Sequence, residues 1–207
     1  MVQEQLLARG ISDPRVLAAM KRIPRHEFVP SENRRYAYED APVAIGHGQT
    51  ISQPYMVALM SESLCLAGPE KVLEIGSGSG YQAAILSCLC ANVFTVERIE
   101  PLLTSARRVW EKLGIANIHS CCADGSLGWL QESPFDAIVV TAAAPEELSM
   151  LTGQLKEGGR LLVPIDNRAG QVLTEIIRKK DRLEHREICR CVFVPLVGKF
   201  GLVSDER

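Results

Sequence analysis

The sequence predicts an α/β protein with a doubly wound, mostly parallel sheet, and two observations indicate this fold class. Beyond Gly68, short apolar runs alternate with helical segments. A glycine turn, GSGSG at residues 76–80, directly follows the first of these runs. The chain has 207 residues, 46% of them hydrophobic, which is enough to bury one core. We therefore expect a single domain.

The first 68 residues form a predicted helical extension. The pattern is helical from Met1 to about Pro30, and Asp13 followed by Pro14 is a typical helix start. A polar stretch, 30–40, follows. GHGQTISQP, at residues 46–54, then predicts a glycine loop followed by another helix. Pro54 is compatible with the start of that helix, because proline is tolerated in a first turn.

Residues 69–167 follow the element order of a parallel sheet. The expected strands are KVLEI, NVFTVE, NIHSCCA, FDAIVVT and GRLLVPI. The expected helices start at about Tyr81, run through PLLTSARRVWEKLG, and lie near Glu146 to Leu155. Strand, helix and strand in repetition require right-handed crossovers, which cover both faces of the sheet.

The last forty residues break this alternation. QVLTEIIRKK and LEHREICRCVFVPLVG are two expected strands joined by the short turn KKDR. They predict an antiparallel hairpin at one edge of the sheet. We expect one domain, 1–207, composed of the N-terminal helical and substrate-side extension (1–68), a cofactor-binding core (69–167) and C-terminal strands (168–207).

Charge and cysteine content disfavour several classes of function. Lys and Arg total 23 against 25 Asp and Glu, a net charge of −2, so we expect no nucleic-acid or membrane partner. No apolar signal core follows a basic start, so we expect a cytoplasmic protein, and we expect it to be a monomer. The seven cysteines contain no CxxC pair, which disfavours a metal site or a disulfide framework.

The glycine turn predicts a cofactor site. Gly76, Gly78 and Gly80 let the backbone turn at positive φ and let a ligand touch the main chain. Dinucleotide enzymes usually carry G-x-G-x-x-G, whereas this G-x-G-x-G spacing resembles the methyltransferases that use S-adenosyl-L-methionine. That resemblance implies their Rossmann-like fold and this cofactor, with no metal. Glu74 and Ser77 in the same motif are further candidate cofactor residues.

Two acidic residues near the next strand ends support this interpretation. Glu97 ends NVFTVE, where a carboxylate can accept both ribose hydroxyls, although a strand-end Glu is otherwise a solvated charge. Asp124 and Gly125 follow the third strand, where a carboxylate can accept a hydrogen bond from the adenine amino group. The alternative is an ordinary Asp-Gly turn. Suitable groups at three successive strand ends favour an adenosine ligand.

Further motifs indicate the methyl acceptor. Methyltransferases of bases often carry Asn-Pro-Pro-aromatic or a Pro-Cys nucleophile, whereas this chain has TAAAP at 141–145 and no Pro-Cys. GQTISQPYMVA, VLEIGSGSGYQAAIL, FTVER, PFDAIVVTAAAP and LKEGGRLLVPI resemble, in this order, the protein-L-isoaspartate O-methyltransferase family. The resemblance runs from PRHEFVP to the C-terminal CVFVPLVG, and GQTISQP is its specific element.

The resemblance implies methyl transfer to the free carboxylate of L-isoaspartyl residues in damaged proteins and peptides. The ester then closes to a succinimide without enzyme, and this reopens partly to normal aspartate. The family's active-site serine falls on Ser52, its ribose acid on Glu97 and its adenine-side acid on Asp124. Two local departures are His47, in GHGQT, and the residues of DGSLGW.

This chemistry requires no general base, because a carboxylate with a pKa of about 4 is already ionised at neutral pH. The protein needs to hold the acceptor oxygen roughly 3 to 3.5 Å from the methyl carbon, in line with the breaking bond. Ser52 can orient the carboxylate through its hydroxyl, although a helix N-cap is the alternative role. The other expected substrate-side residues are Thr50, Ile51, Thr141, Ala142 and Ala143. We expect a peptide to add as a strand beside CVFVPLVG.

Three other functions share parts of this pattern. A methyltransferase for a small-molecule carboxylate or hydroxyl would use every cofactor residue. A sensor or scaffold would bind the cofactor without turnover. A nicotinamide oxidoreductase is disfavoured by the glycine spacing and by a chain too short for a second, substrate-binding domain.

Overall fold

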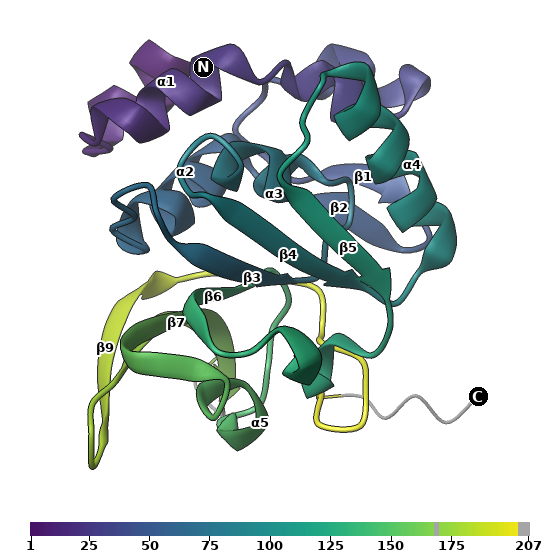
Figure 1. Cartoon of the computed structure of the whole chain (residues 1–207). Helices are drawn as coiled ribbons and strands as arrows, with labels where there is room; N and C mark the ends of the chain where they lie inside the picture. The colour runs from purple at the N-terminus through teal and green to yellow at the C-terminus, as the bar shows by residue number, and fades with distance from the viewer. Residues whose placement is uncertain (168–169, 203–207) are drawn as a thin grey trace.

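The computed structural model describes residues 1–167 and 170–202, and a seven-stranded sheet forms its centre (Figure 1). The strands are β3 (Lys71–Ile75), β4 (Asn92–Glu97), β5 (Ile118–Cys122), β6 (Phe135–Val140), β7 (Leu155–Asn167), β8 (Gly170–Arg178) and β9 (Leu183–Arg190). Their order is β5-β4-β3-β6-β7-β8-β9, with β5 to β7 parallel. The predicted doubly wound, mostly parallel sheet is confirmed, and its strand order reverses at β3.

The parallel strands are buried on both faces. Successive side chains of a strand point to opposite faces, so Val72 and Val93 pack with the larger group of helices while Leu73 and Val140 pack on the other side with Leu151. This two-sided burial is the reason that these strands are nearly continuous apolar runs in the sequence.

Four helices lie on one side of the sheet and a short helix lies on the other side (Figure 1). They are α1 (Pro14–Arg22), α2 (Pro54–Ser63), α3 (Tyr81–Leu86), α4 (Glu100–Lys112) and α5 (Ser149–Thr152). Of these, α1 packs against α2 and α3. The predicted start of α1 is confirmed, because the Asp13 carboxylate accepts the backbone N–H of Arg15 at 2.7 Å and of Val16 at 3.3 Å.

Two helix predictions were too long. The helix expected near Glu146 to Leu155 is reduced to the four residues of α5, and Leu155 already begins β7. The Glu147 carboxylate accepts the backbone N–H of Ser149 at 2.9 Å, which delays the helix start. The region before α1 is not a regular α-helix either, because residues 2–6 form a π-helical turn and residues 7–9 a 3-10 turn.

The predicted glycine loop before α2 is instead the tip of a hairpin. β1 (Val43–Gly46) and β2 (Gln49–Ile51) pair antiparallel. His47 and Gly48 form the connection, both at positive φ, 52° and 71°. Two-residue hairpin turns of this kind usually carry Asn-Gly, so His-Gly is an unusual form of a recognisable signal.

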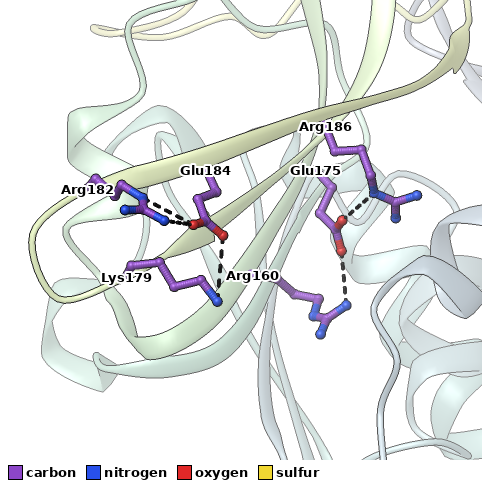
Figure 2. A network of polar contacts seen from close by, with 6 residues as sticks. All are labelled: Arg160, Glu175, Lys179, Arg182, Glu184 and Arg186. Atoms are coloured by element: carbon purple, nitrogen blue, oxygen red, sulfur yellow. Dashed lines mark hydrogen bonds and ion pairs between the residues drawn. The ribbon is translucent and has the colours of Figure 1, made fainter.

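The C-terminal strands form an antiparallel meander, which confirms the predicted hairpin. β8 pairs with β7 and with β9, so β9 is the edge strand. The buried Glu175 carboxylate accepts Arg160 Nη1 at 2.9 Å and Arg186 Nε at 2.8 Å (Figure 2). Arg160 also donates to the Ser63 carbonyl at 3.2 Å, which connects the meander to the end of α2.

The last predicted strand is shorter than its apolar pattern. β9 ends at Arg190, and Gln171 then holds the following segment. The Gln171 carbonyl accepts the Cys191 N–H at 3.0 Å, and its side chain accepts the Phe193 N–H at 2.6 Å. The segment therefore stays extended but leaves the sheet and turns toward the end of β6. There the Leu196 N–H donates to the Ala143 carbonyl at 2.7 Å, and the Ala143 N–H donates to the Val194 carbonyl at 2.8 Å.

Within residues 1–167 and 170–202, no helix has the length and apolar character needed to cross a membrane. The same residues contain no cluster of three or more His, Cys, Asp or Glu side chains that could hold a metal ion. All seven cysteines are free thiols.

Candidate active site

A cleft lies at the carboxyl ends of β3, β4 and β6. The glycine turn forms its floor, and the loops after β4 and β6 and the segment after β9 form its walls. Its lining combines aliphatic, carboxylate and backbone groups, among them Gly78, Glu97, Ile99, Gly125, Thr141 and Leu196. Such a lining suits a ligand with apolar and hydroxyl-bearing parts.

The glycine turn needs glycine for two separate reasons. Gly76 and Gly80 lie at positive φ, 93° and 86°, where a side chain is strained. Both are also in close contact with neighbours. A Cβ on Gly76 would lie 2.7 Å from Thr141 Oγ1, and one on Gly80 would lie 2.8 Å from the Trp110 ring. Gly80 therefore serves packing and is not among the cleft-lining residues.

Glu97 presents its carboxylate to the cleft in a fixed orientation. Its two oxygens accept the backbone N–H of Gly78 at 2.8 Å and of Ile99 at 2.9 Å. Each carboxylate oxygen can accept more than one hydrogen bond, so capacity for a ligand remains. The bond to Gly78 also couples the end of β4 to the glycine turn.

Beneath the turn, three polar side chains form a buried chain. The Thr95 hydroxyl is hydrogen-bonded to the Glu74 carboxyl and lies 2.6 Å from Ser77 Oγ. Glu74 is fully buried, its Oε1 has no hydrogen-bond partner among the described residues, and burial raises its pKa to about 8. Glu74 therefore supports the turn from below and does not line the cleft.

Asp124 binds protein groups in this structure. Its Oδ1 accepts the N–H of Ser126 at 2.8 Å and the Ser126 hydroxyl at 2.6 Å, and its Oδ2 accepts the Lys199 N–H at 2.8 Å. These contacts fasten the C-terminal segment to the loop after β5. Gly125, the next residue, does line the cleft.

A second, outer pocket of about 420 Å³ adjoins the cleft. The two share Thr50, Ser52, Thr141 and Val194 as lining residues. Ser52 does not cap α2, because the N-cap is Gln53 and it makes no side-chain capping bond. Within residues 1–167 and 170–202 the Ser52 hydroxyl has no hydrogen-bond partner and is free to bind a ligand.

The backbone of Ser52 is held by a buried arginine. Arg25 has no exposed surface, and its Nε and Nη2 donate to the carbonyls of Ala37 and Ser52 at 2.6 and 2.7 Å. Its guanidinium carbon lies 4.9 Å from the centre of the Tyr81 ring, and burial lowers the arginine pKa to about 10. Arg25 thus links the N-terminal extension to the loop that carries Ser52.

Comparison with known proteins agrees with this geometry. A family profile described as protein-L-isoaspartate(D-aspartate) O-methyltransferase matches residues 1–201. The chain belongs to this family. A protein-L-isoaspartate O-methyltransferase of Geobacter metallireducens is 52% identical over 207 residues, covering 100% of this chain and 96% of its own. Another, of Syntrophotalea carbinolica, is 51% identical over 202 residues, covering 97% and 93%.

Two solved structures resemble this protein-L-isoaspartate O-methyltransferase family member over nearly its whole length. The first is a protein-L-isoaspartate O-methyltransferase that superposes with a TM-score of 0.87 at 34% identity. The aligned region covers 97% of this chain and 67% of the other. A Plasmodium falciparum protein described as the same kind of enzyme, solved with S-adenosyl-L-homocysteine, gives 0.82 at 30% identity and covers 94% and 96%.

The structure brings most predicted site residues of this family member into the two pockets. Those that line the cleft are Thr50, Ile51, Ser52, Gly76, Ser77, Gly78, Glu97, Gly125, Thr141 and Ala142. Glu74, Gly80, Asp124 and Ala143 lie behind it and hold its walls. That each of these residues binds cofactor or substrate stays a prediction.

One wall of the cleft was missed from the sequence. Residues 194–197, the VPLV segment, line the cofactor cleft, and Val194 also borders the outer pocket. The proline after an apolar run was the available signal, because proline cannot donate within a strand and often marks its end. Nothing in the local sequence indicates that this segment returns to the end of β6.

Proposed function

We propose that this chain transfers a methyl group from S-adenosyl-L-methionine to the free carboxylate of L-isoaspartyl residues in proteins, and thereby starts their repair through a succinimide. Membership of the family over residues 1–201 supports the activity. One observation supports placing this activity in the cleft and the outer pocket: the two share a wall formed by Thr50, Ser52 and Thr141. A group transferred from one ligand to another must cross such a boundary.

The cleft residues fit this cofactor. Glu97, fixed by two backbone N–H groups, would accept the ribose hydroxyls, and the backbone at Gly76 and Gly78 would contact the methionine part. Ile99 and Leu196, which also line the cleft, would supply apolar surface for the adenine. When bound, the cofactor supplies an electrophilic methyl group on its sulfonium.

The chain's own residues need only position the acceptor. An isoaspartyl carboxylate is ionised at neutral pH and brings its own nucleophilic oxygen. The Ser52 hydroxyl would donate to one carboxylate oxygen and leave the other directed at the cleft. Thr141 orders the floor beneath, because its hydroxyl donates to the Gly76 carbonyl at 2.6 Å. Exclusion of water from the carboxylate adds to the rate.

The outer pocket suits an extended peptide. Between the contacts that Gln171 makes with Cys191 and Phe193, Val192 has a backbone N–H and C=O with no hydrogen-bond partner among the described residues. A peptide could pair with this free edge as an added strand. Recognition through backbone groups would admit many sequences around the damaged residue.

We further propose that the protein is a cytoplasmic monomer, organised as a single methyltransferase domain, without nucleic-acid or membrane partners. The net charge of −2 offers no attraction to polyanions. Free thiols at all seven cysteines agree with a reducing compartment.

Labelled methyl transfer tests the activity. We expect incorporation into an isoaspartyl peptide and none into the aspartyl peptide of the same sequence, with the label released as methanol after mild base. Equal labelling of both peptides, or labelling of neither, would contradict the proposal.

A further inference from the structure

We propose that Arg190 makes this protein select isoaspartyl segments that carry an acidic side chain two to four residues from the damaged site. This inference rests on the proposed function and names a substrate class within it. It concerns the outer pocket, on the side away from the cofactor cleft.

Among the residues that the structure describes, Arg190 is the one charged side chain that lines the outer pocket. It is the last residue of β9, held by pairing with Val172, and its side chain is exposed. Within residues 1–167 and 170–202 it makes no ion pair and no side-chain hydrogen bond. A fixed backbone with an unpaired cation at a pocket is available to an anionic ligand.

Two other arginines of this hairpin differ in that respect. Arg182 is paired with Glu184, and Arg186 is paired with the buried Glu175 (Figure 2). Their charges are compensated within the hairpin, and neither residue lines the pocket. Arg190 is therefore the arginine of β9 whose positive charge is available to pair with a ligand.

Distance along the chain locates what Arg190 can reach. Val194 borders both pockets and lies four residues beyond Arg190 in an extended segment, roughly 13 Å at strand spacing. A peptide pairing with the free edge at Val192 would advance by the same spacing per residue. The arginine side chain spans part of the roughly 13 Å between Arg190 and Val194. Its guanidinium would therefore meet a substrate side chain two to four positions from the isoaspartate.

The acceptor carboxylate itself is the competing ligand for Arg190. Ser52 and Thr141 line both pockets, whereas Arg190 lines the outer pocket alone. Arg190 is therefore farther from the point of transfer than these two residues. The geometry favours a flanking side chain, and the experiment distinguishes the two ligands.

The test compares kcat/KM for three isoaspartyl peptides that differ at one position, three residues from the isoaspartate, carrying Glu, Gln or Lys. For the unmodified protein we expect Glu to exceed Gln and Gln to exceed Lys, by about two- to fivefold per step, through KM. The differences should shrink at about 0.5 M salt. Arg190→Gln should remove the order, and Arg190→Glu should reverse it.

Arg182→Gln is the matched control, because it removes one positive charge from the same hairpin outside the pocket and should keep the original order. Equal rates for the three peptides with the unmodified protein would overturn the inference, as would an equal response to Arg182→Gln. If Arg190→Gln lowers all three rates alike, Arg190 binds the acceptor carboxylate and the inference is wrong. Absence of methylation on every isoaspartyl peptide would instead contradict the proposed function.

Discussion

The cofactor cleft and the outer pocket are built in different ways. The floor of the cleft comes from the ends of neighbouring strands, β3, β4 and β6, each followed directly by its functional loop. The outer pocket combines the loop before α2, the residue after β6 and the segment after β9, which are far apart in the sequence. Local backbone geometry therefore controls the floor of the cleft, whereas long-range contacts control the outer pocket.

The largest effect is expected from Gly80→Ala, which disturbs the backbone geometry of the glycine turn beneath the cleft. The new Cβ would lie 2.7 Å from Ala106 Cβ and 2.8 Å from the Trp110 ring, at a φ of 86°. Strain and overpacking together should lower the free energy of unfolding by about 4 kcal/mol in urea denaturation. Gly114→Ala is the control, because Gly114 has a φ of 65° but open space, and it should cost about 1 to 2 kcal/mol. Equal losses would show that packing at Gly80 is unimportant.

The buried chain beneath the cleft predicts a pH dependence. Burial raises the pKa of Glu74 from 4.5 to about 8, so the folded state holds a proton that the unfolded state has lost across this range. The free energy of unfolding should therefore fall as pH rises through that window. Glu74→Gln should remove that part of the slope in denaturation curves measured at several pH values. An unchanged slope would contradict the buried, protonated state.

On the pocket side, Ser52→Ala should lower kcat about 100-fold, since misplacing a reacting group by about 1 Å has that cost. The dissociation constant for the cofactor, measured by calorimetry, should change little. Ser63→Ala, at the other end of α2, should leave both quantities unchanged. Equal loss of turnover and of cofactor affinity would argue against an orienting role for Ser52.

The smallest effect is expected from Arg25→Lys, which tests the long-range contact behind Ser52. Lysine cannot reproduce the fork that holds the Ala37 and Ser52 carbonyls, so stability should fall by about 1 to 2 kcal/mol and kcat severalfold. Arg15→Lys is matched, because Arg15 also donates to two carbonyls, those of Leu66 and Leu89, away from the site. It should lower stability without lowering kcat.

A double mutant extends this test. In a Ser52→Ala background, Arg25→Lys should have no further effect on kcat, because there is then no hydroxyl left to position. Multiplicative losses would mean that Arg25 acts on the site by another route.

Much of the fold could be predicted from the sequence because its signals are local. Continuous apolar runs matched β3, β4 and β6 closely, and Asp13-Pro14 located the start of α1. The errors lie where a distant group competes with local pattern. β9 stops at Arg190 although the apolar run continues, because the side chain of Gln171 takes the next ladder position.

The sequence alone determined the glycine turn, the acid at the end of β4 and the serine loop, since each depends on residue type and spacing within a short segment. Only the tertiary structure decided that Glu74 lies beneath the glycine turn, that Asp124 holds the C-terminal segment, that Arg25 holds Ser52, and that Val194 borders both pockets. Burial and hydrogen bonding across the fold make that distinction, because the same carboxylate binds a ligand or a neighbour according to what packs against it.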